Sequence, residues 1–212
     1  MFASLLRMTT KYGFSRVRDQ LIKDLKAAYP TKWDDYKAAR TPGEDVFGVP
    51  KPHPNAVLNL FEAQNVRFAI PFAAYRASLS GFSVLVSDKP STVLPRLTLA
   101  SAVRGGGEIR RLLIRAAHTI VYEEKPLSVC PDSACVLNVG TRFMEQRMEA
   151  LSKLHNAILG EGRGDVLSPP SLGGLTCAKC AEEIEGAHAS RRELCWELLP
   201  AKFSVAKYWD EL

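Results

Sequence analysis

The sequence contains no long apolar run. No hydrophobic stretch approaches the ~20 residues that a membrane-spanning helix needs, and the run at 82–86 is far shorter. The first residues place Arg7 and Lys11 within an apolar pattern, without a hydrophobic signal core or a small-residue cleavage site. We therefore expect no membrane partner, and a cytoplasmic or nuclear location.

Catalytic signatures are scarce as well. The histidines are isolated in the sequence, at positions 53, 118, 155 and 188, and no serine or cysteine has the neighbours of a nucleophile elbow. The glycines at 105–107 lack the Gly-Lys-Ser/Thr ending of a nucleotide-binding P-loop, so we interpret them as the flexible start of a helix. The sequence thus favours a protein that is not an enzyme.

Charge of one sign is not concentrated into a stripe. The formal net charge is +5, from 28 Lys and Arg against 23 Asp and Glu, and the two signs are interspersed. A protein that tracks a phosphate backbone usually carries a basic patch or stripe. We therefore do not expect a nucleic-acid partner. A zinc-stabilised module that binds nucleic acid and is linked to transcription is the alternative function, suggested by the mild basicity and the cysteines.

The cysteines pose the main chemical question. Their odd number, five, favours free or metal-bound thiols over disulfides. Cys130 and Cys135 lie in a loop-rich stretch, whereas Cys177 and Cys180 open an amphipathic segment. Because zinc prefers four tetrahedral soft ligands, and a Cys-x-x-Cys pair at a helix start brings two thiols together, these four residues are candidate ligands of a structural zinc.

Packing offers a second interpretation of the same thiols. A buried cysteine behaves as a small hydrophobic side chain, and Cys195 beside Trp196 is expected to play that role. A helical stripe with the spacing of a buried face consists of Cys177, Cys180, Ile184, Ala187, Leu194 and Leu198. Structural zinc and no cofactor at all therefore both stay open.

The hydrophobic periodicity is helical almost throughout. It predicts a mainly α fold, an irregular bundle of antiparallel helix pairs with loops rich in proline and glycine. The expected helices cover 2–12, 15–28, a short segment from Thr31, 54–64, 71–79, about 108–120, 140–159 and 177–199, while 82–103 is expected to be loop with one weak helix. Gly13 and Pro30 mark helix ends, Ser15 is the expected N-cap of the second helix, and Pro54 belongs to the first turn of its helix.

Buried faces follow from the same spacing. The first helix should bury Phe2, Leu5, Leu6, Thr9 and Tyr12, and the second helix Val17, Leu21, Leu25 and Ala28. We divide the chain into a helical region at 1–159 with a loop at 41–54, a flexible linker at 160–174, and a Cys-led helix at 175–212 that packs back on the bundle.

Several segments resemble one known family. The run Leu5–Ile22, with its aliphatic pair, Thr-Lys-Tyr turn and Arg-rich helix, resembles the helical segment that follows the BTB/POZ fold in fungal BTB-domain proteins. Residues 29–33, 53–75 and 175–200 are similar to later parts of the same helical region. The BTB fold itself would precede Leu5. The resemblance therefore covers the region after the BTB fold, with the BTB core itself missing.

The resemblance implies an accessory module that binds proteins. BTB proteins dimerise and often bridge partners to cullin-type ubiquitin ligases or to transcriptional complexes, although those contacts are made largely by the BTB fold. We therefore expect an adaptor or protein-interaction module. In the absence of its neighbour, the apolar face of the N-terminal helix would be exposed and would promote self-association.

Overall fold

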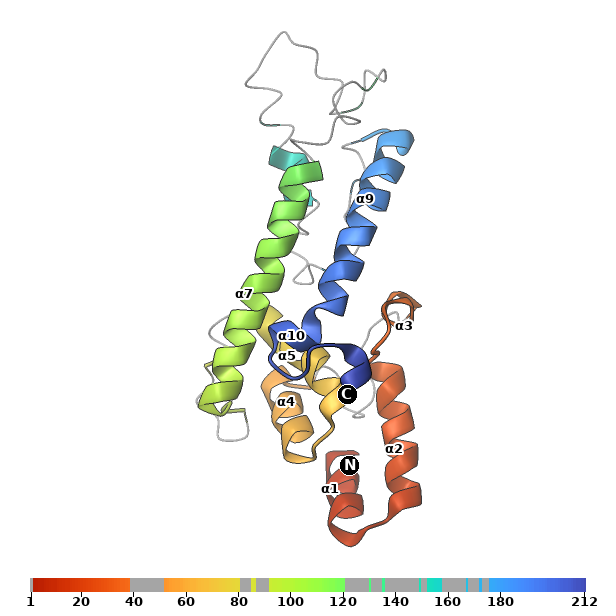
Figure 1. The fold of residues 1–212 in the computed structure, drawn as a ribbon, viewed down its shortest axis with the longest axis vertical. Coiled ribbons are helices and arrows are strands. Elements are labelled where there is room, and N and C mark those ends of the chain that lie inside the picture. The colour runs from red at the N-terminus through yellow and green to blue at the C-terminus, as the bar shows by residue number, and fades with distance from the viewer. Residues whose placement is uncertain are drawn as a thin grey trace. The chain divides into compact units, whose positions relative to one another are not determined.

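The computed structural model describes residues 2–38, 52–80, 85–86, 92–120, 130, 135, 149, 152–157, 167, 172 and 176–212. Over these residues the chain forms helices and no strand, which confirms the predicted mainly α class (Figure 1). None of the helices within this part of the chain has both the length and the apolar character that crossing a bilayer demands.

The chain forms two compact units. Unit 1 comprises Met1–Gly107 and Glu197–Leu212, and unit 2 comprises Glu108–Trp196. The helices that lie wholly in unit 1 are α1 (Phe2–Tyr12), α2 (Ser15–Ala28), α3 (Trp33–Ala38), α4 (Pro54–Ala63), η1 (Arg67–Ala69), α5 (Ile70–Leu79), α10 (Leu199–Lys202) and η5 (Trp209–Glu211). Two longer helices, α7 (Arg96–His118) and α9 (Ala178–Glu197), contribute residues to both units.

The turn between α1 and α2 is governed by Gly13. Its φ of +67° is the left-handed conformation that suits glycine, and it lets the Phe14 N–H reach back to the Thr9 carbonyl at 3.1 Å. This hydrogen bond closes α1 in the Schellman pattern, so the predicted stop at Gly13 is confirmed. The predicted cap at Ser15 is wrong, because Phe14 holds the N-cap position and Ser15 is the first residue of α2.

Only part of the predicted apolar face of these two helices is buried. Leu6 and Leu25 are fully buried, whereas Tyr12, Val17 and, at the margin, Leu5 are exposed. The burial that helical spacing predicts for Leu5, Tyr12 and Val17 is therefore wrong. Spacing identifies which side chains share a face, but the neighbouring element decides how much of that face it covers.

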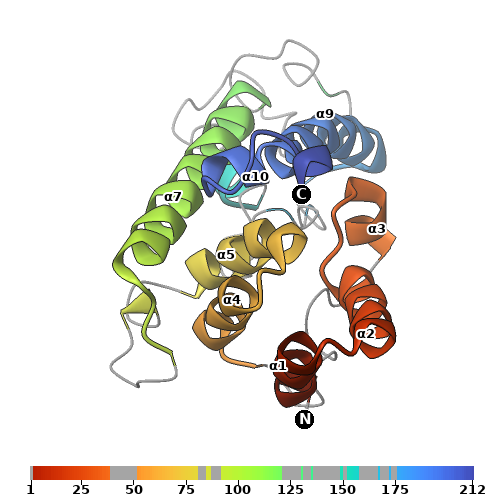
Figure 2. The same ribbon diagram turned by 60° about the horizontal axis from the view of Figure 1, so that its bottom comes forward.

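Helices α4 and α5 form the predicted antiparallel hairpin (Figures 1 and 2). Pro54 stands in the first turn of α4, where its missing N–H removes no hydrogen bond. Asn65 adopts a φ of +51°, and the Val66 N–H donates to the Phe61 carbonyl at 2.8 Å, which ends α4 as Gly13 ends α1. The η1 turn then redirects the chain into α5.

The core of unit 1 is aromatic. Tyr29, at the end of α2, meets the Phe61 ring edge-on at a centroid distance of 4.7 Å and the Phe72 ring at 5.9 Å. Tyr36 of α3 also packs on Phe72, at 5.8 Å, and stacks with Trp33 at 5.2 Å. Edge-to-face pairs of this kind add stability beyond the area they bury, and they join α2, α3, α4 and α5 into one core.

Helix α7 begins earlier than the sequence predicts. It starts at Arg96, so the glycines at 105–107 lie inside it rather than at its start, and that prediction is wrong. The reason is close packing: a Cβ on Gly105 would come within 2.6 Å of the Phe203 ring, and one on Gly106 would collide with the Ser78 side chain. These two glycines serve the packing of α7 rather than its flexibility.

Some sequence predictions fall largely outside the described residues. Of the predicted loop at 41–54 only 52–54 is described, and of the helix at 140–159 only residue 149 and 152–157, which are helical. The predicted linker at 160–174 is described only at Leu167 and Leu172, both buried. The linker and the boundaries at 159 and 175 therefore stay predictions.

Candidate metal centre

Four cysteines of unit 2 converge on one point. The Sγ atoms of Cys130, Cys135, Cys177 and Cys180 all lie within 4.8 Å of one another. The sulfurs of Cys130 and Cys177 lie 3.5 Å apart. All four are free thiols, and all but Cys177 are buried. The structure thus brings together both cysteine pairs that the sequence singles out, across 41 intervening residues of chain.

Helix α9 positions two of the thiols. Cys177 stands just before its first residue, and its carbonyl accepts a hydrogen bond from the Ala181 N–H at 2.9 Å, so the first turn is formed. This turn places Cys180 close to Cys177. Around the thiols lies a buried apolar cluster made of Ala117, Ile120, Leu154, Leu172 and Ile184. The thiols are therefore held among apolar side chains that exclude water from most of the site.

The environment shifts the pKa values of two neighbouring thiols in opposite directions. The backbone N–H of Cys180 lowers the pKa of Cys177, because a hydrogen bond to the thiolate stabilises the charged form. Burial raises the pKa of the Cys180 thiol, because an isolated thiolate is poorly solvated there. A cation among the four sulfurs would reverse that second effect, since a metal ion deprotonates the thiols that bind it.

The sulfur positions fit a tetrahedral zinc ion. With Zn–S bonds of about 2.3 Å, the sulfurs of a tetrahedral site stand about 3.8 Å apart. The distance of 3.5 Å between the Sγ atoms of Cys130 and Cys177 lies near this value. Sulfurs at the upper limit of 4.8 Å would have to approach one another by about an ångström to bind one ion. The donor set, four thiols, is also that of a structural zinc site.

The buried face of α9 differs from the predicted stripe beyond Ile184. Leu194, predicted to point inward, is 52% exposed, whereas His188 and Arg192 are buried instead, together with Cys195 and Trp196. All of these buried positions except Cys195 follow steps of four residues from Cys180, so a strict four-residue register identifies the two polar side chains. The predicted stripe instead follows Ala187 and Leu194. The expected core role of Cys195 is supported by its burial, which raises the pKa of its thiol to about 11.

His188 and Arg192 form a buried polar pair one turn apart. Arg192 donates through Nη1 to the Leu167 carbonyl at 3.3 Å. Neither ring nitrogen of His188 has a hydrogen-bond partner among the described residues. Burial, with a smaller contribution from the Arg192 charge, lowers the pKa of His188 to about 4. His188 is therefore neutral at physiological pH.

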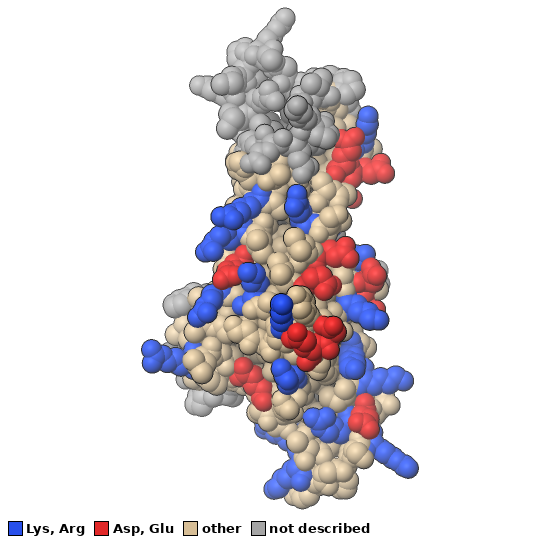
Figure 3. Space-filling view, viewed as in Figure 1, with Lys and Arg blue, Asp and Glu red and all other residues tan. Residues whose placement is uncertain are grey.

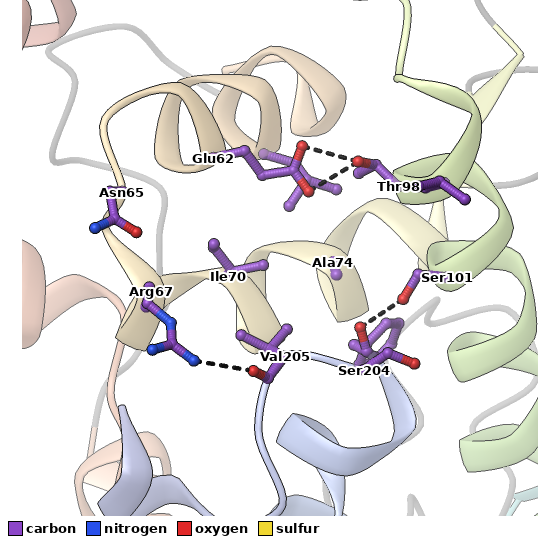
Figure 4. A pocket seen from close by; sticks show the side chains of 12 residues that line it. Glu62, Asn65, Arg67, Ile70, Ala74, Thr98, Ser101, Ser204 and Val205 are labelled. Carbon is purple, nitrogen blue, oxygen red and sulfur yellow. Dashed lines mark hydrogen bonds between the residues drawn. The ribbon is translucent and has the colours of Figure 1, made fainter.

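Unit 1 contains a separate open pocket of about 410 Å³. Figure 4 shows the hydrogen bonds around it: Thr98 donates to the Glu62 carboxylate, with both oxygens at 2.8 Å, Ser101 donates to the Phe203 carbonyl, and Arg67 donates to the Val205 carbonyl at 3.2 Å. These hydrogen bonds join α4 to α7, and they join α7 and η1 to the chain after α10. Among the described residues, no histidine or cysteine lines it.

Comparison with known proteins gives no assignment: no known family, curated protein or solved structure matches the chain. The convergent thiols and the surfaces of the described residues are the features from which a function can be argued. Of these, the thiols have the most specific chemistry, because one ion could bind all four.

Proposed function

We propose that this chain is a non-enzymatic protein-interaction module of the adaptor kind, in which one structural zinc ion holds unit 2 together. The single observation that carries the metal is the convergence of four sulfur atoms within 4.8 Å. The adaptor role follows from the resemblance to the helical region of BTB-domain proteins. Proteins are the proposed partners.

Convergence favours zinc over simple core packing. A cysteine that only fills space can direct its sulfur toward any apolar neighbour, so packing alone gives no reason for four sulfurs to meet. Four such thiols packed together would also gain little, because the S–H group is a weak hydrogen-bond donor. A zinc ion gives all four thiols a common partner, and its binding free energy would contribute directly to folding.

The ligand set supports a structural role for the ion rather than a catalytic one. Catalytic zinc sites use three protein ligands and keep one position for water or substrate. Here four thiols are available, and Cys130, Cys135 and Cys180 are buried. A site closed by four thiolates has no position left at which a substrate could bind.

Metal content is the decisive measurement. Elemental mass spectrometry on protein purified under reducing conditions should find one zinc per chain in the native sequence and none in the double variant Cys177→Ser, Cys180→Ser. Cys195→Ser is the matched control, since Cys195 is also buried but lies outside the set of four. It should keep its zinc. A folded native protein without metal would make the four thiols core side chains and would refute the zinc site.

The alternative, a zinc-stabilised module that binds nucleic acid, rests on the mild positive charge and the cysteine pairs. Basic and acidic side chains intermingle over the face seen in Figure 3. Phosphate contacts are strongest at low salt. A shift in the electrophoretic mobility of DNA or RNA at low salt would therefore favour this alternative. Turnover of a substrate that a single substitution abolishes would contradict the non-enzymatic proposal.

A further inference from the structure

Helix α1 exposes one side of its apolar surface. Leu5 is 37% exposed, Met8 50% and Tyr12 58%, and we name these three side chains the α1 seam. Phe14 and Val17 extend the exposed apolar surface past the turn into α2. Single exposed apolar side chains are ordinary on a protein surface, but neighbouring ones on one helix face often mark a binding site.

The seam exists because the rest of the fold covers only part of the apolar face of α1. Successive residues of a helix rotate by about 100°, which places Leu5, Met8 and Tyr12 on one side of the arc. Leu6 and Thr9 lie on the other side and are buried. Thr9 also donates its hydroxyl hydrogen to the Leu6 carbonyl at 3.0 Å, so the buried side needs no further partner. The seam is left uncovered.

The spacing of the seam suits a helix as partner. Residues 5, 8 and 12 follow steps of three and four, the register along which one helix packs against another. Peptide helices that bind to a protein surface present anchors with the same spacing. Tyrosine and methionine are also enriched at protein interfaces.

Charge around the seam favours an acidic partner. Residues 2–18 include four cations and no acidic residue. Arg7, Lys11 and Arg16 are exposed, and no ion pair within the described ranges neutralises them. Lys11 lies over the Tyr12 ring, 5.3 Å from its centroid, so positive charge directly borders the seam. Figure 3, viewed as in Figure 1, shows basic side chains beside uncharged surface at the end of unit 1 that carries α1.

The same charges disfavour a second copy of the chain. Two seams in contact would bring Arg7 and Lys11 of both copies close together, and like charges at an interface oppose association. We propose that the α1 seam binds an acidic amphipathic helix of a partner protein. This inference rests on the proposed function as an interaction module, and it states the chemistry of the partner. It replaces the sequence-based expectation of self-association through this helix.

A designed peptide pair tests the proposal. One peptide carries leucine at heptad positions a and d and glutamate at e and g; the other has lysine in place of glutamate. Fluorescence anisotropy should show that the full chain binds the acidic peptide at least about tenfold more tightly, a difference of about 1.4 kcal/mol. Binding should weaken when salt is raised from about 0.05 M to about 0.5 M, because screening increases.

Three variants locate the binding site. Met8→Ser with Tyr12→Ser should weaken binding of the acidic peptide at least about tenfold, since apolar contact is lost. Arg7→Glu with Lys11→Glu should reverse the preference, so that the lysine peptide binds more tightly than the glutamate peptide. Leu97→Ser is the matched control: Leu97 is 84% exposed but lies on α7, so binding should not change. Circular dichroism confirms that each variant is folded.

Each contrary result refutes the proposal. Equal affinity for both peptides, no binding, or binding unchanged in the seam variants would each exclude an acidic helix at this surface. Dimerisation of the chain that the seam variants abolish would assign the seam to a second copy. Binding to vesicles with anionic lipid, without peptide binding, would assign it to a membrane surface. The zinc content is measured separately and concerns unit 2, so failure of either proposal leaves the other testable.

Discussion

His188 is a buried titratable side chain of unit 2. It is fully buried on α9, and its two ring nitrogens have no hydrogen-bond partner among the described residues. A buried imidazole in this environment resists protonation, since the charged form would lose its hydration without gaining a partner. The cost of charging His188 is therefore a cost to folding at acidic pH.

The sign follows from the two pKa values. The folded-state pKa of His188 is about 4, below its ordinary value of 6.5. Between these values the unfolded chain binds a proton that the folded chain does not, so stability falls as the pH drops through 6.5 toward 4. Above 6.5 and below 4 this residue causes no further change. From pH 7 to pH 5 it should lower the free energy of unfolding by about 2 kcal/mol.

Replacing the ring tests this expectation. Between pH 7 and pH 5, we expect the free energy of unfolding of His188→Gln to fall by about 2 kcal/mol less than that of the native protein, because glutamine does not titrate in that range. Urea unfolding at several pH values measures the difference, and His155→Gln, a partly exposed histidine outside α9, is the control. Parallel stability curves for His188→Gln and the native chain would contradict the expectation.

At the scale of elements, the glycines of α7 show how packing selects residues within a helix. Gly105 and Gly106 lie against Phe203 and Ser78, and a Cβ at either position would collide with them. A Cβ at Gly107 would meet no atom within 4 Å. Three consecutive glycines therefore have different roles, although the sequence alone presents them as equivalent.

Substitution by alanine should separate these roles. Gly106→Ala should destabilise the protein by about 1–3 kcal/mol through overpacking against Ser78. Gly107→Ala should stabilise it by about 0.5–1 kcal/mol, because alanine loses less backbone entropy in a helix. Urea unfolding gives both values, and Gly186→Ala in the open middle of α9 should resemble Gly107→Ala. Equal effects at 106 and 107 would contradict the packing account.

Several helix ends of unit 1 were predictable, although the start of α7 was not, and the buried faces were predictable only in part. Gly13 and Pro54 carry local signals, a left-handed turn and a first-turn proline, that act through the backbone nearby. Val17 and Leu194 carry the apolar signal of a buried face and yet are exposed. Local chemistry marks helix ends such as these, whereas the burial of a helix face, like the glycines inside α7, depends on which distant element packs against it.

At the scale of the whole molecule, the proposed zinc ion would act on unit 2 alone. All four thiols belong to Glu108–Trp196, whereas the aromatic core around Tyr29 and Phe72 belongs to unit 1. Structural zinc contributes its binding free energy to the fold that holds it. The two units should therefore respond differently when the metal is removed.

Hydrogen exchange can resolve the two units. After a zinc chelator is added under reducing conditions, we expect amide protection to fall in 178–196 and 108–118 and to persist in 54–79, because the hairpin of α4 and α5 has its own core. Mass spectrometry of peptic fragments measures both regions in one experiment, and excess zinc should restore protection. Equal loss of protection in both regions would show that the metal does not act on unit 2 alone.

The sequence by itself determined the mainly α class, most helix boundaries in unit 1 and the two cysteine pairs, because periodicity, proline, glycine and thiol chemistry are properties of short segments. Only the tertiary structure decided that Cys130 and Cys135 meet Cys177 and Cys180, that His188 is buried, and that Glu197–Leu212 belongs with Met1–Gly107. Each of these depends on contacts between residues far apart in the chain. Local patterns contain no information about which distant segments will pack together.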